Sequence, residues 1–181
     1  MGYSQGGALS HGIARYLHKN GDPQLAGQLH VVPNFAIQQD HWTEEYKLEL
    51  AEKSKDPTQT CVFPAKPLKD WSFLLSYIQD DLQFKGPHFA TTIDIVKQVS
   101  DEDREYFKEI THPVHVTRAD GDNILNNSEI NRYFETIKTP AELKEIHGWD
   151  SDHYILSDGW LYEKVLANQA AFLEKVLAKR G

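Results

Sequence analysis

The chain has 181 residues, the size of one domain, and its composition is 40% hydrophobic and 25% charged, as in ordinary soluble globular proteins. A formal net charge of -8 would repel phosphate backbones, so we expect no nucleic-acid partner.

Cys61 is the only cysteine, which excludes an intrachain disulfide and favours a reducing compartment. No Cys and His cluster has the spacing of zinc ligands, and we expect neither a metal nor a cofactor. We expect a cytoplasmic protein, because the sequence has no membrane-spanning apolar run and no signal-peptide pattern.

A glycine-rich turn at the start of the chain leads directly into an expected helix. The turn is the segment GYSQGG at residues 2–7, and the helix is predicted over residues 8–18, where apolar side chains recur at helical spacing. Residues 29–32 are a β-favouring run that predicts a buried strand. We therefore take residues 1–39 as the first part of an α/β core.

The residue pattern in the middle of the chain predicts several consecutive helices. The expected helices are at residues 43–53, 68–84 and 89–99, separated by prolines and a Gly-Pro pair. Another helix begins at Ser100, whose hydroxyl suits a helix N-cap, and ends before Pro113. We expect an all-helical insertion over residues 40–107.

An α/β pattern returns over residues 108–181. The expected elements are a strand at 114–117, a polar turn at 118–122, a helix at 128–136, a weaker strand at 143–146 and a helix at 161–177. The last helix has an apolar stripe, which indicates one buried face.

Ser4 has the surroundings of a nucleophilic serine. A serine hydroxyl needs a base, and hydrolases hold it on a tight strand-to-helix turn with small neighbours. Gly2 and Gly6 flank Ser4 at positions where we expect a larger side chain to collide, and Gly7 leaves room for the helix to start. The backbone N–H of Gln5, at the helix N-terminus, would face a developing oxyanion.

An acid is expected at the end of a later strand, where it would orient the base. Asp120 and Asp122 both follow the strand predicted at 114–117, and either could simply belong to a solvated turn. We favour Asp122, because the residues after it can turn the chain away from the strand tip. A calcium-binding EF-hand is excluded, since Ile124 occupies a position that needs an oxygen ligand.

A histidine base is expected in the loop before the last helix. His153 lies there, between acidic residues and the helix predicted at 161–177. His147 is the alternative, although its place beside a strand candidate favours a structural role. The remaining histidines share no spacing, and we assign them no role.

With the order Ser4, Asp122, His153, the chain resembles the α/β-hydrolase superfamily, whose members carry nucleophile, acid and histidine in that order. The resemblance implies an α/β fold, namely a partial α/β-hydrolase fold with a helical cap inserted at residues 40–107. It also implies a serine hydrolase that acts on a small-molecule ester or other acyl substrate. An acyltransferase with the same three residues is an open alternative.

In that superfamily several strands precede the serine turn, whereas only Met1 precedes Gly2 here. We therefore expect the C-terminal portion of a hydrolase, either truncated or completed by another chain. An unpaired sheet edge would favour self-association or such completion. A second alternative is a non-catalytic interaction protein that keeps the hydrolase scaffold.

Overall fold

The structure is a computed structural model. It describes residues 1–21, 25–39, 42–53, 55–56, 60–62, 90–92, 101–122, 124–157 and 159–179. The chain divides into two compact units, one of Met1–Ile37 with Gln98–Gly181 and one of Gln38–Lys97. The first unit contains every residue of the expected site.

A parallel sheet of four strands organises the first unit, in the order β1-β2-β5-β6. The strands are β1 (Gly2–Tyr3), β2 (Gln28–Val31), β5 (Val114–Ala119) and β6 (Lys144–Trp149). β1 is an edge strand, with β2 as its one partner in the described part of the chain. The strands expected at 29–32, 114–117 and 143–146 are confirmed.

Backbone hydrogen bonds continue the sheet one residue past the strand ends. Ser4 N donates to Val31 O (2.9 Å), and Val32 N donates to Thr117 O (2.8 Å). Asp120 N donates to Trp149 O (2.8 Å). These bonds fix the start of each loop that leaves the sheet at its carboxyl edge.

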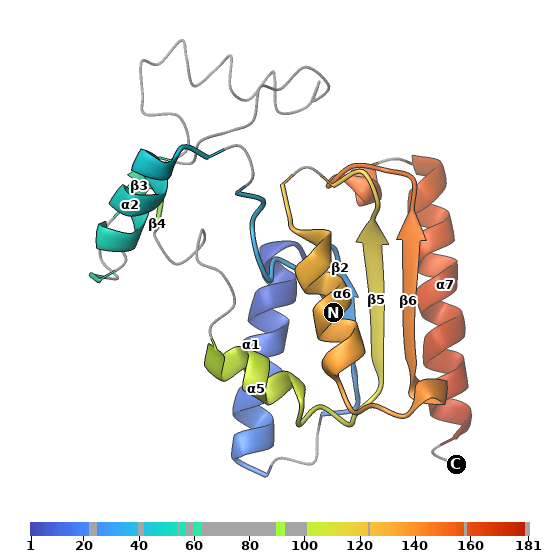
Figure 1. The fold of residues 1–181 in the computed structure, drawn as a ribbon. Helices are drawn as coiled ribbons and strands as arrows, with labels where there is room; N and C mark the ends of the chain where they lie inside the picture. The colour runs from blue at the N-terminus through green and yellow to red at the C-terminus, as the bar shows by residue number, and fades with distance from the viewer. Residues whose placement is uncertain are drawn as a thin grey trace. The chain divides into compact units, whose positions relative to one another are not determined.

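Helices lie on both faces of the sheet (Figure 1). The helices are α1 (Gln5–Lys19), α5 (Asp101–Phe107), α6 (Asn127–Thr136) and α7 (Gly159–Ala178), with short 3-10 turns η1 (Ala141–Leu143) and η2 (Ile155–Ser157). α1, α5 and α6 share one face, while α7 covers the other. The Asn126 side chain caps α6 by accepting a hydrogen bond from Ser128 N, which satisfies one of its otherwise free N–H groups.

The main core lies between the sheet and the face of α5 and α6. Its buried members are Phe35, Tyr106, Phe107, Ile110, Val114, Val116, Ile130, Tyr133 and Ile137. Alternation along β5 turns Val114 and Val116 toward this core and His115 toward α7. The ring of Tyr133 packs 4.9 Å from that of Phe107. The side chain of His115 therefore lies in the other layer, against Phe172 of α7.

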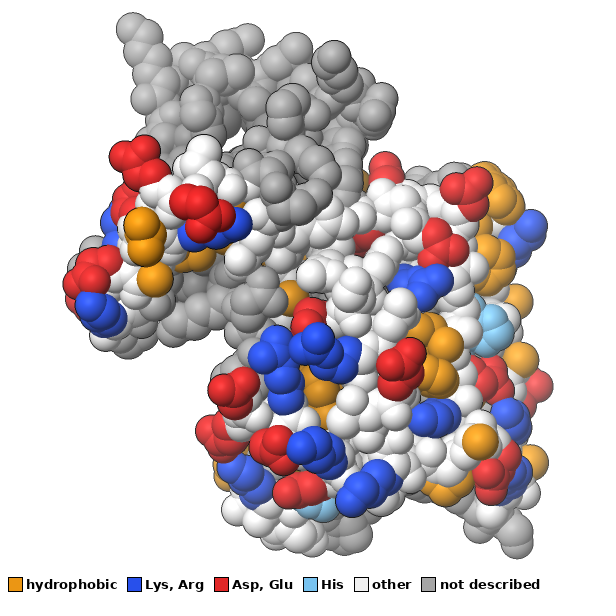
Figure 2. All heavy atoms as spheres, viewed as in Figure 1, with side chains coloured by type: hydrophobic (Ala, Val, Ile, Leu, Met, Phe, Trp, Pro, Cys, Tyr) orange, Lys and Arg blue, Asp and Glu red, His pale blue; other side chains and the backbone are white. Residues whose placement is uncertain are grey.

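The helix expected at 8–18 is present as α1, but its buried face differs from the apolar stripe in the sequence. Gly7, His11 and Ala14 are buried, whereas Leu9 and Ile13 are 63% and 60% exposed. The ring of His11 packs against the aromatic core. Arg15 and Lys19 of the same helix form salt bridges with acidic residues of the first turn of α5. Figure 2 shows such Lys and Arg side chains beside Asp and Glu side chains over this face.

The second unit contains both helix and strand. Helix α2 (Glu44–Lys53) agrees with the expected helix at 43–53. β3 (Thr60–Val62) pairs antiparallel with β4 (Ala90–Thr92), so the expectation of an all-helical insertion is wrong at these residues. Thr60, Val62, Thr91 and Thr92 are β-branched, a composition that favours strands. The helix expected at 68–84 lies outside the described residues, as does most of the one at 89–99.

The first unit resumes at Gln98, before the boundary expected at residue 107. α5 therefore belongs with the sheet, and Phe107 is part of the core. The role of residues 40–97 as a cap stays a prediction. Within the described residues, no helix is both long and apolar enough to cross a membrane.

Candidate active site

Ser4 lies on a sharp turn between β1 and α1. Its φ of 51° and ψ of -118° are unusual for a residue with a side chain. Besides the bond from Ser4 N to Val31 O, Asn34 N donates to Ser4 O at 2.9 Å. The hydroxyl makes no capping bond to α1, so it is available to a partner outside the helix. Such strain at a serine on a sharp turn is typical of a functional turn.

Two glycines make this turn possible, although not the pair expected from the sequence. A Cβ on Gly2 would lie 2.1 Å from Gly6 O, and a Cβ on Gly7 would lie 2.7 Å from Cα of Pro33. A Cβ on Gly6 would meet nothing within 4 Å. The expected collision at Gly6 is therefore wrong, because the backbone of Gly6 is the obstacle that Gly2 avoids. Gly7 instead lets α1 pack closely on the chain after β2.

Asp122 lies in the loop after β5, with its side chain fully buried. Its Oδ1 accepts hydrogen bonds from Ile124 N and Leu125 N, both at 2.9 Å. The rival, Asp120, forms an ion pair with Arg118 and has a 47% exposed side chain. The loop therefore turns Asp122 inward and Asp120 toward solvent.

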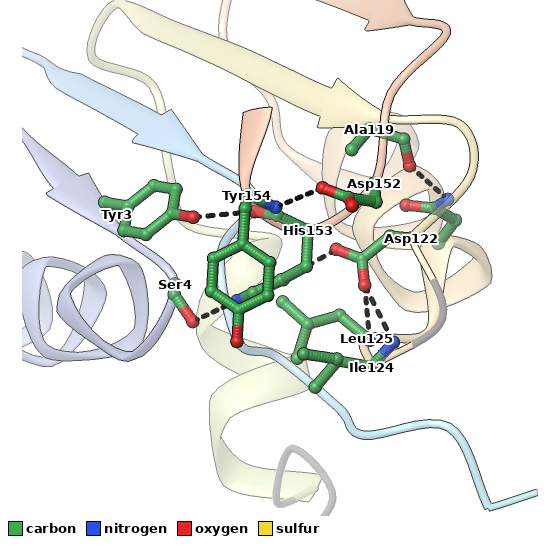
Figure 3. A network of polar contacts seen from close by, with 10 residues as sticks. Tyr3, Ser4, Ala119, Asp122, Ile124, Leu125, Asp152, His153 and Tyr154 are labelled. Carbon is green, nitrogen blue, oxygen red and sulfur yellow. Dashed lines mark hydrogen bonds and ion pairs between the residues drawn. The ribbon is translucent and has the colours of Figure 1, made fainter. Parts of the chain in front are cut away.

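His153 joins Ser4 and Asp122, as Figure 3 shows. His153 Nδ1 lies 2.9 Å from Asp122 Oδ2, and His153 Nε2 lies 2.8 Å from Ser4 Oγ. A buried carboxylate can only accept, so it favours the tautomer with hydrogen on Nδ1 and leaves Nε2 to accept from the serine. The His153 side chain is 7% exposed. The three residues expected from the sequence are thus brought together in a hydrogen-bonded chain.

Tyr3 and Tyr154 extend this arrangement, and the sequence analysis missed both. Tyr3 Oη donates to the backbone O of His153 at 2.7 Å, and the Tyr154 ring packs edge-on against the imidazole of His153, with centroids 5.4 Å apart. Burial, with the nearby charges of Asp122 and Asp152, raises the pKa of Tyr3, so its hydroxyl stays a donor. The signal for Tyr3 was its place beside Ser4 in the turn.

Gln5 is the first residue of α1. It has no earlier helical turn whose carbonyl could accept its N–H, and the positive end of the helix dipole lies at the same place. This N–H is therefore suited to stabilise negative charge that forms beside Ser4 Oγ.

His147, the alternative base, lies within β6 rather than in a loop. Its Nε2 is 3.3 Å from Glu145 Oε2, and its ring stacks on that of His115 with centroids 5.3 Å apart. Neither contact involves Ser4. The position of His147 on a strand face agrees with the structural role that the sequence favoured.

Comparison with solved structures gives the fold. A monoacylglycerol lipase from Paleococcus ferrophilus matches with a TM-score of 0.68 and 21% identity over 96% of this chain and 67% of that one. A soluble variant of monoglyceride lipase from Saccharomyces cerevisiae, solved with a substrate analog, gives 0.69 and 14% identity over 97% and 64%. An α/β hydrolase from Penicillium sp. sh18 gives 0.63 and 18% over 98% and 63%.

These matches mean that nearly the whole chain corresponds to about two thirds of each solved protein. No family model matches the sequence, and a search of curated proteins finds no match. At such identities the likeness concerns the fold alone.

Proposed function

Because the chain has part of the α/β-hydrolase fold, we propose that it carries the catalytic triad of a serine hydrolase that acts on an ester or another acyl substrate. The observation that carries the proposal is the chain of hydrogen bonds from Ser4 Oγ through His153 to the buried Asp122. The strained turn at Ser4 supports it independently. All three side chains follow the carboxyl ends of parallel strands, where α/β folds place their ligand sites.

Acylation begins when Ser4 Oγ attacks the carbonyl carbon of the substrate. His153 Nε2 accepts the hydroxyl proton as the new bond forms. Asp122 keeps the imidazole oriented and stabilises its positive charge, while two backbone N–H groups hold its other oxygen. Gln5 N–H stabilises the oxyanion of the tetrahedral intermediate.

Collapse of this intermediate breaks the bond between the carbonyl carbon and the leaving alcohol. The alcohol departs with the proton that His153 received from Ser4, and an acyl-enzyme remains. A water molecule then gives a proton to His153 Nε2 and attacks the acyl carbon. The carboxylic acid leaves as the proton returns to Ser4 Oγ, which restores the starting state.

The similar structures support an ester as the substrate, since two of them are named as lipases for monoacylglycerol or monoglyceride. The chain corresponds to only 64% to 67% of those two proteins. Groups that complete the oxyanion site or shape the acyl pocket can therefore lie in the part that this chain does not match. Both the substrate class and the activity of the chain on its own are therefore proposed.

A fluorophosphonate probe tests the triad, because it phosphonylates only a serine that a neighbouring base activates. We expect labelling of Ser4 in the folded chain, with no labelling of Ser4→Ala and almost none of His153→Ala. His18→Ala is a matched control, since His18 is an exposed histidine on α1, the helix that follows the nucleophile turn. Intact mass and peptide mapping identify the site. Absence of labelling in protein with native circular dichroism would overturn the proposal.

A non-catalytic interaction protein is the second candidate. The exposed apolar side chains of Leu9, Ile13 and Tyr16 on α1 favour it, since each is at least 60% exposed, and β1 has a free edge in the described part of the sheet. This candidate predicts a folded protein that the probe does not label and that self-associates with increasing concentration. Sedimentation velocity beside the labelling experiment separates the two candidates.

A further inference from the structure

A second group of histidine and carboxylate side chains lies on the face of the sheet that α7 covers. We call His115, Glu145 and His147 the histidine–glutamate cluster. His115 pairs with Glu145 across β5 and β6, and Thr117 pairs with His147. Since side chains two residues apart on a strand share a face, this register brings all three onto one side. One donor atom from each lies within 4.8 Å of the other two.

The two imidazoles are held in place by their neighbours. The rings of His115 and His147 stack at an interplanar angle of 21°, and His115 also packs on Phe172 of α7, with centroids 5.3 Å apart. His115 Nε2 lies 3.1 Å from Asn168 Oδ1. An amide oxygen can only accept, so this contact places the hydrogen of His115 on Nε2.

The second ring nitrogen of His115, Nδ1, is buried and makes no hydrogen bond among the described residues. His115 is 0% exposed. A buried acceptor without a partner costs free energy and calls for a reason. Metal-binding histidines commonly donate one ring N–H to a neighbouring acceptor and bind the ion with the other nitrogen, and His115 makes the first of these contacts with Asn168.

We propose that His115, Glu145 and His147 form a Zn²⁺ site that joins β5 and β6 beneath α7. Two imidazoles and one carboxylate are a ligand set that zinc accepts, with water in the fourth position. Ligand atoms around tetrahedral zinc are about 3.4 Å apart, given bonds near 2.1 Å. The donors therefore need to approach one another by rotation of the two partly exposed side chains, Glu145 and His147.

Lys175 competes with an ion at this site. Its Nζ lies 2.6 Å from Glu145 Oε1, whereas Glu145 Oε2 faces His147. The lysine leaves one carboxylate oxygen for a metal but adds a positive charge beside it. Replacing Lys175 by Met would remove the repulsion while keeping the apolar stem.

Isothermal titration calorimetry of the full chain with ZnCl₂ tests the site. We expect one Zn²⁺ per chain, with affinity at least about tenfold weaker in His147→Ala and in Glu145→Gln. Asn168→Ala, which removes the hydrogen-bond partner of a ligand, should weaken binding by about tenfold. Lys175→Met should strengthen it by about threefold or more. Co²⁺ absorption bands of tetrahedral geometry would report the ligand set directly.

His18→Ala is the matched control for zinc. His18 Nε2 lies 3.4 Å from Glu109 Oε2, and among the described residues this pair belongs to no group of three possible metal ligands. We expect unchanged zinc affinity in this variant. The proposal is wrong if the full chain binds no Zn²⁺, or if His147→Ala and Glu145→Gln bind it as tightly as the parent. The site lies outside the Ser4 turn, so its failure leaves the proposed hydrolase unaffected.

Discussion

The candidate triad and the histidine–glutamate cluster use the same kinds of side chain in different backbone settings. Ser4, Asp122 and His153 come from loops that follow three strands, whereas the cluster residues lie within strands. In the triad, backbone N–H groups hold the carboxylate, and the imidazole faces a hydroxyl. In the cluster, a lysine holds the carboxylate. Loops at strand ends thus place an acid, a base and a hydroxyl in a hydrogen-bonded chain. A strand face instead holds its histidine and carboxylate side chains at positions that the strand register determines.

The largest expected effect is on kcat, when Asp122→Asn is compared with Asp120→Asn. The amide at residue 122 would favour the wrong imidazole tautomer, so kcat for an activated ester such as p-nitrophenyl butyrate should fall by about 10⁴-fold. Asp120 is two residues away and pairs with Arg118 in solvent, so Asp120→Asn should change kcat by less than about twofold. Equal losses in the two variants would remove the distinction between the buried and the exposed carboxylate.

The backbone of the triad can be tested with Gly2→Ala and Gly6→Ala. The methyl group at residue 2 would overlap the Gly6 carbonyl, and we expect a loss of about 3 kcal/mol in the free energy of unfolding, together with slower probe labelling. At residue 6 the methyl has open space within a helix, so stability should stay level or rise by up to about 1 kcal/mol. Urea titrations measure both, and the reverse order would mean that the turn differs from the one described.

Two buried histidines outside both groups, His11 and His30, should make stability depend on pH. Burial lowers the pKa of His11 to about 4 and that of His30 to about 3. The unfolded chain therefore binds more protons below about pH 6.5, and stability, full above that pH, declines as pH falls toward 4. Each histidine contributes up to about 1.4 kcal/mol per pH unit. Denaturant titrations from pH 7.5 to 4.5 should show a smaller slope in His11→Phe, and an identical slope would contradict this assignment.

The smallest expected effect concerns Tyr3, which we regard as a positioning residue. Tyr3→Phe removes the bond to the His153 carbonyl, and one such bond contributes about 1 kcal/mol. We expect kcat to fall about fivefold with little change in KM, and the melting temperature to fall by about 2 to 4 °C. Tyr162→Phe, at a 44% exposed position on α7, is the control. A change in KM alone would show that Tyr3 contacts substrate instead of holding the histidine loop.

The sequence predicted most elements of the first unit and the three candidate site residues because their signals are local. Glycines around Ser4, a β-branched run before Asp122 and a long apolar stripe after His153 each belong to one short segment. Position also favoured Asp122 over Asp120, since Asp122 follows Gly121 and directly precedes residues that turn the chain toward the next helix. The structure brings together the same three residues.

The missed features depend on pairing between distant segments. The roles of Gly6 and Gly7 follow from how α1 packs on Pro33, and no pattern of residues gives that distance. The histidine–glutamate cluster requires the register of β5 against β6. The pairing of β3 with β4 joins residues that are 28 to 32 positions apart, and the local pattern at β4 predicted part of a helix at 89–99.

The hydrogen bonds just beyond the strand ends have a consequence for exchange with solvent. Ser4 N, Val32 N and Asp120 N each donate across to the next strand, so these bonds cross the sheet from β1 to β6 beside the triad. Release of one of these bonds would loosen the loop that it anchors and the loop that follows the adjacent strand. Deuterium uptake at these three amides should therefore rise together, as one cooperative opening, before the amides within β5 exchange.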